Sequence, residues 1–206
     1  MVRIPGRRAG VNFTEFCQSI VSPALRAVAL HWNEVRGTKK MPSWHDIRPK
    51  AIARCLPWVW AYKFDRTSEE FVGRLAGNCI ERAYGKSFHG LTLAQIHTCP
   101  DRYKAGRSLL LRVISEPAIF LGHGRVFQFK VQFHSGERLM LPLSTDGVFG
   151  DGVFGATECG PLPLAHEPVQ GINDIGEWLS LKDAFSWRNL LSRNSSSLDV
   201  SSNRVR

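Results

Sequence analysis

The chain has 206 residues, of which 43% are hydrophobic and 22% charged, as is ordinary for a soluble globular protein with one core. No apolar run approaches the roughly 20 residues that span a bilayer, and the basic start lacks the hydrophobic stretch of a secretory signal, so we expect a cytoplasmic protein. The five cysteines are odd in number and none forms a pair with zinc-type spacing. We therefore expect reduced thiols and no metal site.

The net charge of +9 raises the question of nucleic acid or acidic lipid as a partner. Arginines gather at the two ends of the chain, within residues 3–8 and 193–206. Basic arms of this kind are most often solvated termini, and neither a basic helix nor an RNA-binding sheet motif accompanies them. Nucleic-acid binding is therefore kept only as the last of three alternatives.

Two helices are predicted before the central domain, after a flexible basic arm over residues 1–21. Ser22-Pro23 is a helix cap followed by proline in the first turn, and Gly37 ends that helix. An apolar stripe at helical spacing lies between them, at Leu25, Val28, Ala29, Trp32 and Val35. A short helix is predicted from Pro49 to Leu56, which makes residues 22–56 a flanking segment.

The central domain, residues 57–158, opens with two predicted strands and continues with helices. Residues 58–64 alternate strictly, and both faces of this strand are at least partly apolar, which is typical of a central strand. The segment 71–77, "FVGRLAG", is its expected hairpin partner. Three helices are predicted over 78–116, in "NCIERAY", "LTLAQIH" and "DRYKAGRSLLLRVISE".

The period then returns to two, which predicts three more strands. They are a short strand at 118–122, a strand at 126–134 that turns at Ser135-Gly136 into its partner at 138–144, and a last strand at 151–158. "GHG" between the first two is expected to be a turn or a flexible link. Residues 159–192 are interpreted as a proline-rich linker and an amphipathic helix, and 193–206 as a disordered serine-rich tail.

This order of elements predicts an α+β domain: a five-stranded antiparallel sheet with short helices on one face and a flanking N-terminal helix. PAS domains have the same arrangement. Short motifs in the chain resemble, in order, the landmarks of an alphaproteobacterial PAS-like family over about residues 25–158. They are His31-Trp32, Arg36-Gly37, Pro42, Asp46-Ile47-Arg48-Pro49, Leu56-Pro57, Arg74-Leu75-Ala76-Gly77, Gly85 through Gly90, and Leu141-Pro142-Leu143-Ser144.

The glycines in "RLAGNCIERAYGKSFHG" are expected to be corner residues where the chain leaves the sheet, at Gly77, Gly85 and Gly90. A phosphate-binding loop would need an earlier glycine at the right spacing and a strand leading into it. No hydrolase, metalloprotease or nucleotide-binding motif is present either, so we expect no catalytic residues and no enzyme.

The resemblance implies a ligand pocket between sheet and helices, and the candidate residues for it are Trp60, Arg74, Tyr84, Phe88, Phe129 and Leu141. Arg74 interrupts an apolar strand, where it could hold a carboxylate or phosphate, or simply point outward or form a salt bridge. Asn78-Cys79 is similar to the cysteine motif of flavin-binding PAS domains but lacks its continuation. His89 and His97 lie where haem-binding PAS domains have their ligand, yet nothing selects one of them. We therefore expect neither haem nor flavin.

The first functional hypothesis is a sensory or regulatory module of bacterial signal transduction. A small molecule or a protein contact would shift the population of the flanking helices and change homodimerisation or the binding of a downstream protein. The second hypothesis is a ligand-free adaptor that docks a partner through its sheet face or its C-terminal helix. Candidate residues for the partner or dimer face are Leu25, Val28, Trp32, Trp178 and Phe185.

Overall fold

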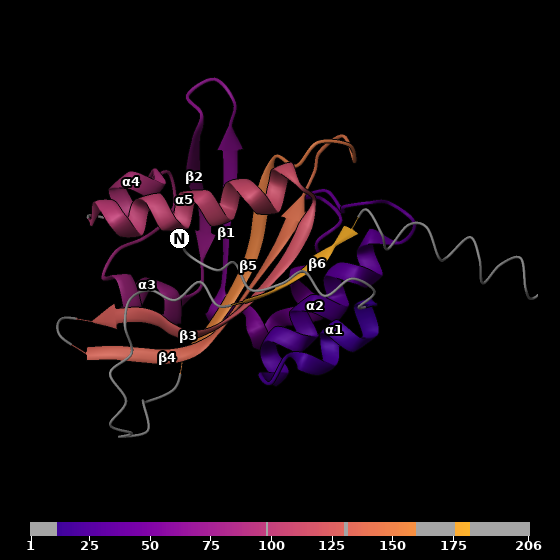
Figure 1. Ribbon diagram of the computed structural model, residues 1–206, viewed down its shortest axis with the longest axis horizontal. Helices are drawn as coiled ribbons and strands as arrows, with labels where there is room; N and C mark the ends of the chain where they lie inside the picture. Colours follow the sequence, from indigo (N-terminus) through magenta and orange to yellow (C-terminus); the bar gives the residue numbers. More distant parts are fainter. Residues whose placement is uncertain (1–11, 98, 130–131, 160–175, 182–206) are drawn as a thin grey trace, which may run out of the picture.

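Residues 12–97, 99–129, 132–159 and 176–181 are described by a computed structural model, with side chains for all of them except 125–135 and 159 (Figure 1). The helices are α1 (Phe13–Ser19), α2 (Pro23–Arg36), the 3-10 helix η1 (Pro49–Trp58), α3 (Asn78–Tyr84), α4 (Leu93–Ile96) and α5 (Pro100–Ser115). The strands are β1 (Val59–Asp65), β2 (Glu70–Ala76), β3 (Ala118–Phe129), β4 (Gln132–Leu143), β5 (Gly152–Cys159) and β6 (Gly176–Ser180). No helix in these ranges is long and apolar enough to cross a membrane.

The strands form one antiparallel sheet in the order β2-β1-β5-β4-β3-β6. The predicted α+β class is confirmed, and the sheet has six strands where five were predicted. The additional strand, β6, pairs with the edge of β3 from Ala118↔Ser180 to Gly122↔Gly176.

Helices cover both faces of the sheet, and each face has its own hydrophobic core. Figure 1 shows α4 and α5 on one side of the sheet and α1 and α2 on the other. The inner core lies between the sheet and α3, α4 and α5, and the outer core lies between the sheet and α1, α2 and η1. Along β1, Trp60 and Tyr62 belong to the inner core, whereas Val59 and Ala61 belong to the outer core. The prediction that this strand is central and buried on both faces is confirmed.

The segment expected to be a flexible arm is structured from residue 12 onward. Asn12 and Glu15 form a capping box that starts α1. Phe16, Cys17 and Ile20 are each at most 5% exposed and belong to the outer core. The flexible-arm prediction is therefore wrong for residues 12–21, because three apolar side chains are buried there, and residues 1–11 lie outside the described part.

The β3–β4 hairpin turns earlier in the sequence than predicted. β3 runs through "GHG" without a break, and Ser135 and Gly136 pair inside the ladder with Arg125 and Gly124. The turn lies between Phe129 and Gln132. Gly124 has a φ of 123° and a register shift follows it, so the strand accommodates the glycine as an irregularity instead of ending there.

The start of the predicted C-terminal helix is the strand β6. Trp178 packs against Phe120 with a ring-centroid distance of 4.8 Å, and Arg112 lies 3.9 Å from the Trp178 ring centroid. Leu179 and Leu181 are buried in the outer core. A helix would have left the edge of β3 unpaired, so tertiary pairing decides the conformation here. Phe185, like the rest of the predicted helix, lies outside the described residues.

Candidate ligand cavity and the docking of the N-terminal helices

A cavity lies in the inner core, between the sheet and the helices α3 to α5. The space open to the centres of water-sized molecules is about 30 Å³, within about 370 Å³ of unfilled space that includes the open mouth. About 10–15 Å³ of the first kind of space holds one water molecule, so the cavity has room for two or three. It is lined by Trp60, Tyr62, Ile80, Tyr84, Phe88, Leu93, His97, Gly106, Leu110, Arg138, Met140 and Thr157.

Aromatic rings in mutual contact form one wall of this cavity. Tyr62 lies between Trp60 and Phe88, with a ring-centroid distance of 5.6 Å to each. Tyr84 makes edge-to-face contacts with Phe88 and His97, at ring-centroid distances of 5.0 and 5.4 Å. Such edge-to-face and tilted contacts fix the orientation of the rings, so the wall is a shaped apolar surface.

Polar groups from the sheet converge at one side of the cavity. The hydroxyl oxygen of Thr157 accepts hydrogen bonds from the Trp60 Nε1–H at 2.8 Å and from the Arg138 Nε–H at 3.3 Å. Arg138 and Thr157 are directly opposite each other on β4 and β5, and both line the cavity. The sheet register therefore places a guanidinium and a hydroxyl beside the aromatic wall.

Burial, and after it the nearby cations Arg138, Arg102 and Lys86, together lower the pKa of His97 from 6.5 to about 4. This imidazole is neutral at neutral pH. Burial also raises the pKa of Tyr84 and raises that of Tyr62 well above its usual value, while Arg138 partly opposes both changes. The cavity thus contains neutral phenols, a neutral imidazole and the arginine cation.

Three of the six residues expected to form a ligand pocket line this cavity: Trp60, Tyr84 and Phe88. Leu141 lies on the opposite face of the sheet, fully buried in the outer core. Arg74 is exposed on β2, where its guanidinium lies 4.6 Å from the ring centroid of Trp44. The side chain of Phe129 lies outside the described part of the structure.

The polar residues of the cavity, Arg138, Thr157 and His97, were not among the predicted pocket residues. A usable signal for Arg138 is present in "RLMLPLS", where Leu139 and Leu141 alternate with Arg138 and Met140. Once the leucines occupy the outer core, the same alternation places Arg138 and Met140 on the inner face. In "GVFGATEC" the same alternation separates Thr157 from Phe154 and Ala156, but it does not distinguish a cavity hydroxyl from an ordinary buried one.

The corner glycines behave as predicted. Gly85 and Gly90 have φ of 68° and 76°, values that L-residues with a side chain rarely adopt. Gly77 has an ordinary φ, but a Cβ there would collide with the backbone of Leu56 and Pro57. Cys79, on α3, is not among the residues that line the cavity. Within the described residues no group of three or more His, Cys, Asp or Glu could hold a metal ion.

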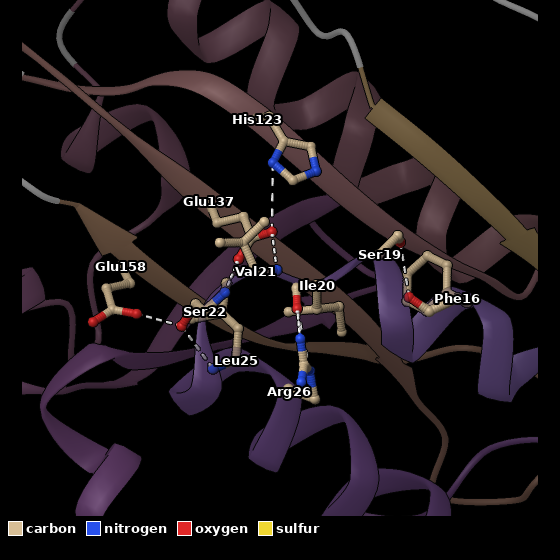
Figure 2. A network of polar contacts seen from close by, with 10 residues as sticks. All are labelled: Phe16, Ser19, Ile20, Val21, Ser22, Leu25, Arg26, His123, Glu137 and Glu158. Atoms are coloured by element: carbon tan, nitrogen blue, oxygen red, sulfur yellow. Dashed lines mark hydrogen bonds and ion pairs between the residues drawn. The ribbon is translucent and has the colours of Figure 1, made fainter. Parts of the chain in front are cut away.

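The N-terminus of α2 is held on the outer face of the same two strands (Figure 2). The Glu137 carboxylate, 6% exposed as a residue, accepts hydrogen bonds from the N–H groups of Val21 at 2.8 Å and Ser22 at 2.7 Å. The Ser22 hydroxyl caps α2 by accepting from the Leu25 N–H at 3.1 Å, and it donates to the carboxylate of Glu158. Carboxylates at a helix N-terminus also interact favourably with the helix dipole.

The apolar stripe of α2 packs within the chain. Leu25, Val28 and Trp32, expected to contact a partner or a second copy, are 0% exposed in the outer core. The indole Nε1–H of Trp32 donates to the carbonyl of Pro142 on β4 at 3.0 Å. These residues hold α2 on the sheet and are not accessible to another molecule in this structure.

Among known proteins, the match is to a family described as PAS domain, over residues 20–157. This range agrees with the resemblance seen over about residues 25–158 and spans more than half of the chain. No curated protein and no solved structure matches the chain. The six-stranded antiparallel sheet, the short helices α3 and α4 and the longer α5 on its inner face agree with the family match, and the chain belongs to the PAS domain family.

Proposed function

We propose that this chain is a cytoplasmic PAS sensory module of signal transduction without catalytic activity. In this proposal a small molecule binds in the inner cavity and changes how α1 and α2 dock on the outer face. A downstream protein or a second copy then recognises the released or rearranged helices. PAS domains are typically sensory or regulatory modules, which supports the general role.

One observation carries the proposal: on β4 and β5, the residues that line the cavity are adjacent in sequence to the residues that bind the N-terminus of α2. Arg138 and Thr157 line the cavity and pair with each other across the two strands. The residues next to them, Glu137 and Glu158, also pair with each other and bind Ser22. Consecutive strand residues point to opposite faces, so a shift of the strands at the cavity must also move the carboxylates that hold α2.

The mechanism is a shift between two populations of the N-terminal helices. Two carboxylates directly opposite each other on a sheet repel, and the backbone N–H groups and the hydroxyl at the start of α2 offset this repulsion. A ligand that binds better when α2 is displaced would favour the displaced state by its difference in affinity for the two states. That difference in affinity is the upper limit of the shift in the equilibrium.

Hydrogen exchange of the Val21 and Ser22 amides tests this coupling without a known ligand. Gly106→Leu fills the cavity from α5, and Thr157→Val removes the hydroxyl on the opposite wall. We expect both variants to change the exchange rates of these two amides. Arg74→Met replaces an exposed arginine outside the cavity and should leave these rates unchanged. If neither cavity variant alters exchange at Val21 and Ser22, the cavity and the N-terminal helices are not coupled and the proposal fails.

The small cavity volume favours a second candidate, a ligand-free PAS adaptor. An adaptor would dock its partner through an exposed surface or through residues beyond β6. Deletion of residues 182–206 tests this, because it leaves β6 and the buried Leu179 and Leu181 in place. Two results together would favour the adaptor. The deletion should abolish partner capture from cell extract without changing thermal stability, and Gly106→Leu should leave exchange at Val21 and Ser22 unchanged.

A further inference from the structure

We propose that the cavity binds a small monocarboxylic acid, with its carboxylate against Arg138 and Thr157 and its short apolar chain against the aromatic wall. This inference rests on the proposed function and specifies the chemical class of the ligand. It is carried by the hydrogen-bonding capacity of the groups that face the cavity, by the charge around them and by the volume available.

The Thr157 hydroxyl is the first argument for an acceptor. A hydroxyl group has two acceptor lone pairs and one proton to donate. Here the oxygen already accepts from the Trp60 indole and from Arg138, so its remaining capacity is that of a donor. Thr157 is 1% exposed, and within the described residues no acceptor is seen for its proton. A ligand oxygen in the adjoining cavity would supply one.

The charge around the cavity is the second argument. The described residues that line it include Arg138 and no Asp or Glu. Arg102 and Lys86 are close enough to His97 to act on its titration in the same direction as Arg138. A guanidinium suits a carboxylate, because it carries N–H donors in addition to the Nε–H that Arg138 donates to Thr157.

The remaining lining limits the size and polarity of the ligand. Trp60, Tyr62, Phe88, Leu110 and Met140 present mostly apolar surface. Inorganic phosphate has no apolar part to contact this wall. The space of about 30 Å³ open to the centres of water-sized molecules suits a chain of only a few heavy atoms, so an acid of the size of propionate is the first choice of ligand.

The test is a titration of the full chain with propionate, observed through the indole N–H resonance of Trp60 and assigned with Trp60→Phe. This proton is bonded to Thr157, so a carboxylate at that hydroxyl must shift its resonance. We expect saturable binding of propionate and no binding of inorganic phosphate at the same site. Neutral propionamide should bind at least about tenfold more weakly than propionate. Arg138→Met should weaken propionate at least about tenfold, which is the expected scale for a lost charge-assisted contact.

Arg74→Met is the matched control, because it removes an arginine from the same sheet outside the cavity, and it should leave the affinity unchanged. If Arg138→Met folds poorly, Arg138→Lys serves as the test variant instead. It keeps the charge, so its affinity for propionate should lie between those of the native protein and a variant without the charge. Equal affinity for propionamide and propionate, or no binding of propionate, overturns the inference. The proposed function is judged separately, because the exchange of the Val21 and Ser22 amides in Gly106→Leu does not depend on the nature of the ligand.

Discussion

Gly106 lies in the middle of α5 beside the cavity, and its replacement by alanine should stabilise the protein. Glycine in a helix interior is less favourable than alanine by about 0.8–1.0 kcal/mol. A Cβ at this position would meet only the Nε2 atom of His97, at 4.0 Å, which is an ordinary van der Waals distance. We therefore expect Gly106→Ala to raise the free energy of unfolding by about 1 kcal/mol, since no steric penalty opposes the gain.

Gly85→Ala provides a control of opposite sign. Gly85 ends α3 with a φ of 68°, and a Cβ there would have no atom within 4 Å. Only backbone strain acts, so the substitution should destabilise by about 1–2 kcal/mol. The same added methyl group thus has opposite effects on stability inside α5 and at the end of α3.

Urea denaturation followed by tryptophan fluorescence would measure both changes. In a protein of this size, 1 kcal/mol corresponds to a shift of about 2–4 °C in Tm, and the urea dependence should stay the same for both variants. Gly106→Ala should also weaken propionate binding, because the methyl group enters the cavity. A destabilised Gly106→Ala would refute the reasoning, since it would mean that the space beside His97 is already filled.

Three further predictions concern pH, the Glu137 contact and β6. The pKa of His97 falls from 6.5 to about 4 on folding, so its contribution to stability is complete above about pH 6.5 and is lost as the pH falls toward 4. The free energy of unfolding of the native protein, measured by urea denaturation, should therefore decrease over this range by up to roughly 3 kcal/mol, and by less in His97→Gln. Glu137→Gln should destabilise by about 1–3 kcal/mol and speed exchange at Val21 and Ser22, because one amide oxygen replaces two carboxylate oxygens; unchanged exchange would show that α2 is held elsewhere. Truncation after residue 175 should lower Tm, since Leu179 and Leu181 leave the outer core, while truncation after residue 181 should not; equal Tm values would contradict the role of β6.

Elements bounded by strong local signals could be predicted from the sequence. The helix α2 starts at the Ser22-Pro23 cap and ends before Gly37, and α3 lies between Gly77 and Gly85, as predicted. The signals for β6 are ambiguous, because Trp178 and Leu181 fit a helical spacing while Leu179 and Leu181 fit a strand. Only the unpaired edge of β3 selects the strand, and the sequence does not reveal it.

The choice between two arginines could not be made from the sequence for a similar reason. Arg74 and Arg138 both lie in apolar strands, and Arg74 is the one predicted from the sequence as the pocket residue. In the structure Gly73 pairs with Tyr62 and Leu75 pairs with Ala61, so Arg74 is the extra residue of a β-bulge. A bulge changes the face to which a side chain points, and it arises from the pairing of two strands, which neither strand specifies alone.

The outer core joins segments from both ends of the described chain, and this has a consequence for the order of folding. Phe16 and Ile20 share that core with Leu179 and Leu181, which are separated from them by most of the sequence. During synthesis the N-terminal helices can pack on the sheet only after β4 and β5 exist, and their core is complete only when β6 has emerged. Contacts this distant in sequence slow folding and leave apolar side chains exposed in the meantime. The nascent chain should therefore depend most on chaperones just before residue 181 emerges from the ribosome.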